Sequence, residues 1–135
     1  MNDCIFCKII EGAIPSDKIY EDEHTLAFLD IAPVNYGHTL VIPKKHAKNM
    51  EEIDEETLCK VISTAKRVGK ALKEGLGVDG YNVGMNNDPV AGQVVPHLHF
   101  HLMPRTEGDG LQSWPQGKYG DGEAEEVREK IMSKI

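Results

Sequence analysis

The sequence predicts an α+β fold, in which an antiparallel β-sheet carries one long helix packed on it and short helices lie near both ends of the chain. Short β-branched or alternating segments between turn residues predict the strands. One long run with apolar residues at helical spacing predicts the main helix. The 135 residues are 40% hydrophobic and 27% charged, which is typical of one globular domain over residues 1–135.

The first elements are short. Residues 4–10 place apolar side chains at helical spacing and predict one or two helical turns. Residues 18–21 predict a short strand, and residues 25–31 predict a buried strand that ends at an acid. After a loop with proline and glycine, residues 38–43 predict another strand. The short connection predicts that these last two strands pair antiparallel.

Residues 54–76 predict the long helix. Asp54 is a favourable N-cap, and Ile53 and Leu58 are spaced for a hydrophobic staple. Glycines near Leu76 predict the end of the helix. The residues expected to face the core are Leu58, Val61, Ile62, Ala65, Val68, Leu72 and Leu76.

Beyond the helix, residues 80–86 predict a third core strand. The stretch from Pro96 to Pro104 alternates three histidines with apolar residues, which predicts a strand bracketed by prolines, with the histidines on one face and the apolar side chains toward the core. The C-terminal segment 106–135 is predicted to be irregular, with many Gly and Pro residues and one tryptophan, and then helical from residue 123.

The three histidines of this strand are His97, His99 and His101. A single strand histidine is usually a packing residue, but three in register favour chemistry, because neutral imidazole serves as nucleophile, proton carrier and metal ligand. A nucleophilic ring needs one nitrogen held by an acceptor, commonly a backbone carbonyl. Two neighbouring rings could then donate to the oxygens of a transferring phosphate.

A paired cysteine motif predicts a metal site. Cys4 and Cys7 have the spacing that lets two thiolates reach one tetrahedral ion. Two nitrogen ligands would complete a Cys2His2 zinc site, and all six histidines are candidates: His24, His38, His46, His97, His99 and His101. The alternatives are a redox dithiol or two buried cysteines, although no thioredoxin-like βαβ pattern surrounds the pair.

A loop rich in possible phosphate donors precedes the histidines. It includes Asn86, Gly92, Gln93 and the backbone around Val94. Glycine lets a backbone approach a ligand closely, so the loop is a candidate phosphate cradle. The alternative is an ordinary glycine-containing turn, and no Walker-type phosphate motif is present.

Composition excludes several classes of protein. A formal net charge of −7 argues against nucleic-acid binding, which usually needs a basic patch. No apolar run approaches the roughly 20 residues that span a bilayer. The first residues do not form a secretory signal, and three cysteines do not form a disulfide framework. A cytoplasmic location is therefore expected.

The motif His97-Leu98-His99-Phe100-His101-Leu102-Met103 resembles the signature of the histidine triad (HIT) family of nucleotide hydrolases and transferases, in its Hint-like branch. Blocks spread over residues 4 to 105 resemble the family as well. The resemblance implies a HIT-like α+β fold, two-fold homodimers and an AMP-like purine nucleotide ligand. It implies attack on an α-phosphate through a nucleotidyl-histidine intermediate, with a nucleoside phosphoramidate or a dinucleoside polyphosphate as substrate.

The resemblance also implies roles for single residues. His99 is the expected nucleophile, and His38, His97 and His101 surround it as the other catalytic histidines. Nucleotide contacts are expected from Asp30, Ile31, His38, Asn86, Gly92, Gln93, Val94, His99 and His101. A structural zinc ion is expected on Cys4, Cys7, His46 and His97.

One departure from the family affects the leaving group. Many members have serine where this chain has Val94, so protonation of the leaving group must come from elsewhere, with His101 as a candidate. The alternatives are a non-catalytic nucleotide-binding or scaffold protein, and a hydrolase with zinc at the triad. We further expect the helix 57–76 and the strand 80–86 near the two-fold axis of a homodimer, with Trp114 directed toward the partner's nucleotide pocket.

Overall fold

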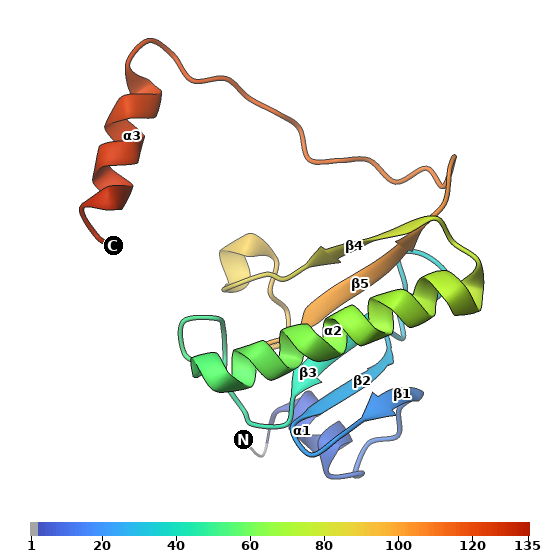
Figure 1. Cartoon of the computed structure of the whole chain (residues 1–135). Coiled ribbons are helices and arrows are strands. Elements are labelled where there is room, and N and C mark those ends of the chain that lie inside the picture. The colour runs from blue at the N-terminus through green and yellow to red at the C-terminus, as the bar shows by residue number, and fades with distance from the viewer. Residues whose placement is uncertain (1–2) are drawn as a thin grey trace.

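The structure, a computed structural model, describes residues 3–135. Its sheet contains the strands β1 (Lys18–Glu21), β2 (Thr25–Leu29), β3 (Thr39–Pro43), β4 (Gly80–Gly84) and β5 (Phe100–Arg105). The helices are α1 (Ile5–Ile10), α2 (Glu55–Leu76) and α3 (Glu123–Met132), with a short 3-10 turn, η1 (Pro89–Ala91). The strand order is β1-β2-β3-β5-β4, and every neighbouring pair is antiparallel, which confirms the predicted fold class (Figure 1).

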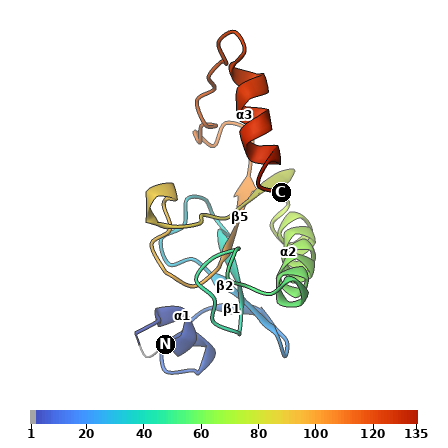
Figure 2. The same cartoon turned by 90° about the vertical axis from the view of Figure 1, so that its left-hand side faces the viewer.

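Helices lie on both faces of the sheet. α2 runs across one face, and α1 lies on the other (Figure 2). Two hydrophobic clusters match these layers. One joins α2 to Val41, Leu98, Phe100 and Leu102, and the other joins Phe6 and Ile9 of α1 to the remaining inward side chains of β2 and β3. The apolar residues between the histidines therefore face the core, as predicted.

Helix α2 agrees closely with the prediction. The side chain of Asp54 accepts a hydrogen bond from the Thr57 amide, and Gly77 ends the helix in the left-handed conformation with φ of 67°. Most of the predicted core stripe is buried, but Ile62 and Leu76 are 46% and 39% exposed. These two side chains lie at the rim of the stripe, so part of the apolar surface of α2 remains uncovered within this chain.

The histidine strand begins later than predicted. β5 starts at Phe100, so His97 and His99 precede the strand and only His101 lies within it. The reason is a set of hydrogen bonds that bend the chain. The His97 amide donates to Val95 O at 2.8 Å, and the Leu98 amide donates to Ala47 O at 2.7 Å. Neither bond belongs to a sheet ladder.

Pro104 lies inside β5, although the sequence predicted it as the residue that ends the strand. It pairs with Tyr81 of β4, and its carbonyl oxygen accepts a hydrogen bond from Asn35 Nδ2 at 2.9 Å on the opposite side. Its nitrogen faces that same side, where β3 offers no partner because β3 begins at Thr39, opposite Leu102. The missing N–H therefore removes no bond from the β4 ladder.

β1 has the predicted bounds, whereas β2 and β4 are shorter than predicted. β2 ends at Leu29, so Asp30 and Ile31 lie in the following loop. The Asp30 amide donates to His38 O, and Asp30 Oδ1 accepts from the Ala32 amide, which turns the chain. β4 ends at Gly84, and it is a half-exposed edge strand rather than a central one.

The C-terminal segment leaves the sheet altogether. Residues 106–122 contain no helix or strand, and α3 stands away from the rest of the chain (Figure 1). α3 ends at Met132 rather than at the predicted residue 135. Within residues 3–135, no helix is long and apolar enough to cross a membrane.

Candidate active site and metal-binding group

His99 has one ring nitrogen fixed and the other available. Its Nδ1 donates to the carbonyl oxygen of His97 at 2.7 Å, because a carbonyl can only accept. Nε2 is therefore the unprotonated nitrogen of the neutral ring. The ring is 6% exposed and packs edge-on against Phe6, with ring centroids 5.1 Å apart. This geometry leaves a lone pair on Nε2 for attack on an electrophile.

His38 and His101 form a directed hydrogen-bond chain. The backbone amide of Val34 donates to His38 Nδ1 at 3.1 Å, which places the proton of the neutral ring on Nε2. His38 Nε2 then donates to His101 Nδ1 at 2.9 Å. His101 consequently carries its own proton on Nε2. The His99 and His101 ring centroids are 4.9 Å apart, so a donor stands beside the nucleophile.

Burial keeps these histidines neutral. It lowers the pKa of His101 to about 4, and the nearby His99 and His38 rings act in the same direction. Burial likewise lowers the pKa of His38 and of His99, although the Asp30 carboxylate opposes the shift at both. The Asp30 carboxylate lies 3.7 Å from His38 Nε2. A neutral His99 is the form that a nucleophile requires.

Asp30, His38 and His101 also have the proximity of a metal-binding group, since their ligand atoms lie within 4.8 Å of one another. The tautomer of His38 argues against this role. Its Nδ1 accepts the Val34 amide, so its Nε2 carries a proton and has no lone pair for a metal. The cluster is better described as a hydrogen-bond chain.

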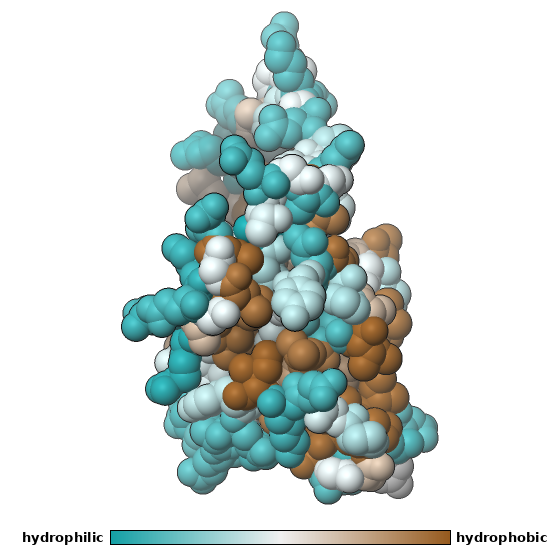
Figure 3. Space-filling model, turned by 90° about the vertical axis from the view of Figure 1, so that its right-hand side faces the viewer, coloured by the Kyte–Doolittle hydropathy of each residue, from teal (hydrophilic) through white to brown (hydrophobic). Residues whose placement is uncertain are grey.

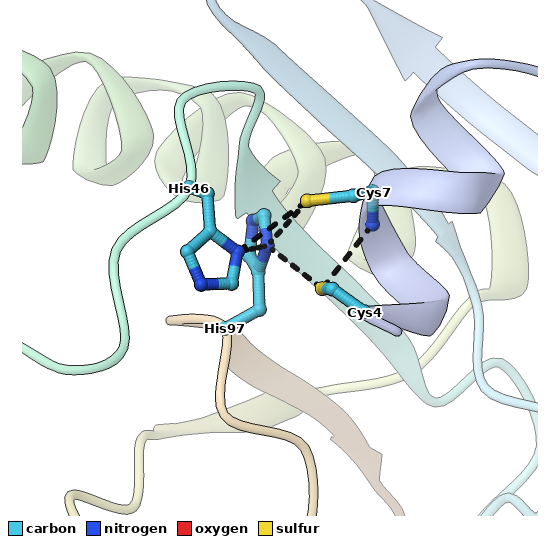
Figure 4. A group of neighbouring side chains, drawn as sticks. All are labelled: Cys4, Cys7, His46 and His97. Carbon is cyan, nitrogen blue, oxygen red and sulfur yellow. Dashed lines mark hydrogen bonds between the residues drawn. The ribbon is translucent and has the colours of Figure 1, made fainter. Parts of the chain in front are cut away.

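The predicted metal ligands do come together. The side chains of Cys4, Cys7, His46 and His97 converge from the start of α1, the loop after β3 and the segment before β5, as Figure 4 shows. His97 Nδ1 lies 3.4 Å from Cys4 Sγ, 3.6 Å from Cys7 Sγ and 3.2 Å from His46 Nδ1. His46 Nδ1 lies 3.4 Å from Cys7 Sγ. These are the ligand types and spacings of a closed tetrahedral site.

The tautomer of the His97 ring suits a metal ion held between the four side chains. Its Nε2 donates to Pro43 O at 2.8 Å, so its Nδ1 presents a lone pair to the two sulfurs and to His46. Burial and the neighbouring Cys4 raise the pKa of the Cys7 thiol to about 11, and burial lowers the pKa of His97 to about 4. A positive ion would reverse the first effect and favour the thiolate, so the donor set suits a divalent metal.

His97 links the two sites. Its side chain is fully buried in the metal-binding group, and both ring nitrogens are engaged there. Its backbone carbonyl holds His99. The sequence predicted His97 as both a catalytic residue and a metal ligand. In this geometry it acts on the nucleophile through its main chain and not through its ring.

Gln93 stabilises the loop of predicted phosphate donors that precedes the histidines. Its Oε1 accepts the Asp88 amide at 2.7 Å, and its Nε2 donates to Lys48 O at 2.6 Å and to Val95 O at 3.0 Å. The side chain is 7% exposed. Gln93 was predicted as a phosphate ligand, but its polar groups are used to join the loop that carries His46 to the loop that precedes His97.

Other predicted ligand residues remain open to solvent. Val94 and Ile31 are 89% and 98% exposed. Within residues 3–135, the Val94 amide donates no hydrogen bond, which leaves it free for a phosphate oxygen. Gly92 has φ of 96°, and a Cβ there would lie 3.2 Å from Asn86 Nδ2, so glycine suits the position.

A pocket of about 570 Å³ opens beside His38 and His101, where two of the predicted catalytic histidines line it. Its wall is mainly apolar and includes Met85, Met103, Leu111 and Trp114. Trp114, for which the sequence predicts an approach to a partner's nucleotide pocket, is exposed in this single chain and lines this pocket. The cation of this pocket, Arg105, is engaged by Asp109 at 2.7 and 3.0 Å.

Several groups that shape the candidate site were not predicted from the sequence. They are Phe6 beside His99, the Val34 amide on His38, the Pro43 carbonyl on His97, and the Arg105–Asp109 pair. Three of them act through backbone atoms or packing that no motif records. The Arg105–Asp109 spacing is visible in the sequence, but common spacing of opposite charges identifies no site by itself.

Comparison with known proteins agrees with the geometry. A family model described as "HIT domain" matches residues 11–108. An uncharacterized HIT-like protein of Methanocaldococcus jannaschii is 58% identical over 107 residues, covering 79% of this chain and 82% of its own. The adenosine 5′-monophosphoramidase of Schizosaccharomyces pombe is 45% identical over 134 residues, covering 98% of each chain.

Solved structures match as well. A HIT family protein of Bacillus subtilis has a TM-score of 0.90 at 40% identity, covering 98% of this chain and 97% of its own. A Streptococcus mutans protein has a TM-score of 0.94 at 41% identity, covering 100% and 87%. A zinc-bound histidine triad family protein of Mycobacterium smegmatis has a TM-score of 0.78 at 35% identity, covering 99% of both chains. With its five-stranded sheet and its triad, this chain belongs to the HIT family.

Proposed function

We propose that this protein hydrolyses an AMP-like purine nucleoside phosphoramidate through a nucleotidyl-His99 intermediate. The observation that carries the proposal is the fixed Nδ1 of His99, which leaves Nε2 as a free nucleophile beside the protonated Nε2 of His101. A relative named adenosine 5′-monophosphoramidase, aligned along nearly the whole chain, supports the same reaction class.

The reaction has two balanced steps. His99 Nε2 attacks the α-phosphorus, the bond from phosphorus to the leaving nitrogen breaks, and the departing amine takes a proton at the position of His101 Nε2. Water then attacks the same phosphorus, the bond to His99 breaks, and the proton released by water returns to His101. A bound phosphate adds negative charge that raises the pKa of His101, so the ligand itself favours the acid form.

Each remaining residue has a proposed position around this centre. Asp30 and Ile31 contact the ribose and base, and Asn86 with the backbone of Gly92 and Val94 holds the phosphate. Gln93 holds that loop in place rather than binding phosphate directly. The open Val94 amide supports this arrangement.

The pocket beside His101 favours an amine over a second nucleotide as leaving group. A dinucleoside polyphosphate would bring further phosphates, which are best bound by cationic side chains that are not already paired with an acid. Arg105 is instead paired with Asp109, and the rest of the wall is largely apolar. An apolar or aromatic amine fits such a wall better. Polyphosphate hydrolysis is therefore the second candidate.

Zinc is the proposed metal, held by Cys4, Cys7, His46 and His97 in a structural role. When bound, it supplies a rigid cross-link between α1 and the segment that carries the nucleophile. A closed set of four protein ligands leaves no coordination position for water, which disfavours a zinc hydrolase mechanism. The zinc-bound Mycobacterium smegmatis relative supports the assignment.

A cytoplasmic homodimer is the proposed form of the protein. β4 lies at an edge of the sheet, where its Val83 is 49% exposed, and Ile62 of α2 is 46% exposed. Edge strands with open backbone groups and apolar neighbours are commonly covered by a second copy.

The decisive experiment is a product screen with adenosine phosphoramidates and dinucleoside polyphosphates, followed by rapid quench and mass analysis of the protein. We expect AMP and free amine, and a protein mass increased by one AMP group that maps to His99. The absence of turnover on both classes, with AMP still bound, would favour the non-catalytic nucleotide-binding or scaffold alternative.

A further inference from the structure

We infer that Asn35 is a positioning residue for His101: its side-chain amide orients the loop after β2 so that the Val34 amide stays on His38. The inference rests on the proposed function, in which the leaving amine takes its proton from His101 Nε2. Asn35 belongs to the β2–β3 loop, residues 30–38, at the end of the sheet where β5 also finishes (Figure 1).

The side chain of Asn35 is the polar anchor of this loop. Its Nδ2 donates to Pro104 O at 2.9 Å and to Asp109 Oδ2 at 3.0 Å. A carbonyl and a carboxylate can only accept, so the amide nitrogen and not the amide oxygen faces both of them. Within the described part of the chain, no other residue between Asp30 and His38 forms a hydrogen bond to any segment other than this loop and β3.

Apolar packing does not fix the orientation of the loop. Ile31, Val34 and Tyr36 are 98%, 48% and 85% exposed. At this end of the molecule hydrophobic side chains gather on the body, while the part that projects from it is mostly hydrophilic (Figure 3). Apolar contacts have no preferred direction, whereas hydrogen bonds fix direction as well as distance. The two hydrogen bonds of the Asn35 amide therefore determine how the loop is turned toward β5.

Asp109, the charged partner of this amide, is itself held in place. Its carboxylate is 6% exposed, and it also accepts hydrogen bonds from Arg105 at 2.7 and 3.0 Å and from the Thr106 and Leu111 amides at 3.2 and 3.1 Å. The Arg105 guanidinium holds the pKa of this carboxyl well below its usual range, so the group remains an acceptor. The anchor of Asn35 therefore has a fixed place beyond the end of β5.

The main chain of the loop carries the effect to the histidines. Asn35 O accepts the His38 amide at 3.0 Å, and the adjacent Val34 amide donates to His38 Nδ1 at 3.1 Å. The second bond places the His38 proton on Nε2, which donates to His101 Nδ1 at 2.9 Å. Once the Val34 amide is withdrawn, the same pair can run in reverse, with His101 Nδ1 as the donor. His101 Nε2 then has no proton to give to a leaving group.

The test replaces Asn35 with aspartate, which keeps the shape of the side chain but sets a carboxylate oxygen against two acceptors. Asn49→Asp is the matched control. The Asn49 amide also donates to an aspartate, Asp88, at 3.1 Å, but from a loop that forms no hydrogen bond with the β2–β3 loop in the described part of the chain. Long-range proton–nitrogen correlation spectra of the full chain at neutral pH report the tautomer of each histidine ring.

The wild-type spectra should show His38 and His101 protonated on Nε2, and His99 protonated on Nδ1. In Asn35→Asp the ring nitrogen shifts of His38 and His101 should move toward the Nδ1-protonated pattern, while His99 keeps its own because His97 O still holds it. Unmoved shifts in a folded Asn35→Asp variant, or the same movement in Asn49→Asp, would overturn the inference.

Turnover gives a second readout that a merely structural role would not move selectively. With an alkyl phosphoramidate of adenosine, kcat of Asn35→Asp should fall at least about tenfold, because the amine needs a proton to leave. With an adenylate ester of an electron-poor phenol, which leaves without a proton, kcat should change less than about threefold. Equal losses on both substrates would show that Asn35 does not act through the acid.

A second variant keeps the test decisive if Asn35→Asp does not fold. Asn35→Ala removes both hydrogen bonds without adding charge, and it should move the same two rings by a smaller amount; unmoved rings would again overturn the inference. The tautomer measurement needs no turnover. A wild type that shows no turnover but responds to Asn35→Asp as described would refute the proposed function alone, whereas normal turnover with unmoved tautomers would refute the role of Asn35 alone.

Discussion

The carbonyl oxygen of His97 accepts the Nδ1 proton of His99 at 2.7 Å, while the His97 ring belongs to the metal-binding group. One residue therefore sets the tautomer of the proposed nucleophile and takes part in the proposed zinc site. The two functions use different atoms of the same residue. The consequence is that loss of the metal should disturb the nucleophile through displacement of the backbone, and not through loss of a catalytic ring.

Replacing His99 with alanine should abolish turnover and leave AMP binding nearly intact. Removal of a covalent nucleophile commonly costs several orders of magnitude in kcat, whereas a buried ring that does not contact the base adds little to affinity. Stopped-flow turnover and calorimetric titration with AMP measure the two effects. His24→Ala, an exposed histidine outside the site, is the control. A variant that retains about a tenth of kcat would contradict the assignment, since the loss would be only about 1.4 kcal/mol.

Zinc removal should lower stability without removing catalytic groups. One ion per chain should co-purify, and the double change Cys4→Ala and Cys7→Ala should eliminate it. A ligand present at about a thousandfold over its dissociation constant stabilises the folded state by about 4 kcal/mol, so the melting temperature should fall clearly. Cys59→Ala, at an exposed cysteine, should retain both metal and stability. Wild-type protein purified without chelators and found free of metal would refute the site.

Gln93→Glu should weaken both metal retention and nucleotide binding. The glutamate can still accept the Asp88 amide, but its second oxygen would face the carbonyl oxygens of Lys48 and Val95. Unmaking buried hydrogen bonds costs roughly 1–3 kcal/mol. We expect faster zinc loss to a chelator and a KM increased about tenfold, with the exposed Gln116→Glu unchanged in both. If Gln93→Glu alters KM alone, Gln93 is a direct phosphate ligand instead.

His101 should titrate near pH 4 in the free protein. Burial lowers its folded-state pKa to about 4 from an ordinary value of 6.5. Below pH 6.5 the unfolded chain binds the proton first, so this group's contribution to stability is present above that value and is lost as the pH falls toward 4. Ring resonances followed by NMR should show the low pKa, and addition of AMP should raise it. Titration near 6.5 without ligand would show that the ring is more solvated than its contacts indicate.

Trp114→Ala should change leaving-group preference more than AMP affinity. The indole lines the pocket beside His101, where it can stack on an aromatic amine, and the loss of such a contact reduces kcat/KM by up to about tenfold. A paired series of aryl and alkyl phosphoramidates measures the preference. Tyr119→Ala, in the same C-terminal segment but outside this pocket, is the control. Equal losses for both substrates would make Trp114 a general packing residue.

Periodicity predicted the sheet and α2 well because each depends on local pattern. The cap at Asp54 and the glycine after Leu76 gave the bounds of α2 correctly. The predicted start of β5 was wrong because a hydrogen bond between two residues far apart in the sequence determines it. The Leu98 amide is taken by Ala47 O, and no pattern within residues 96–104 reports that bond.

The candidate site shows the same division. The spacing of Cys4 and Cys7 predicted a metal site, and the family resemblance implied His46 and His97 as the other two ligands. The structure places the four ligand atoms within 4.8 Å of one another. Spacing could not reveal that the Val34 amide sets the tautomer of His38. It also could not reveal that the side-chain amide of Gln93 already forms hydrogen bonds with backbone groups. Such facts depend on which atoms remain free after folding, and that information exists only in three dimensions.

Pro104 closes one side of β5 where the sheet offers no partner strand. Because β3 begins at Thr39, opposite Leu102, the last residues of β5 have no strand beside them on that side. The side chain of Pro104 is fully buried there, and Asn35 donates to its carbonyl oxygen. Any other residue at this position would bring a buried backbone N–H with no ladder partner, whereas proline has no N–H to leave unsatisfied.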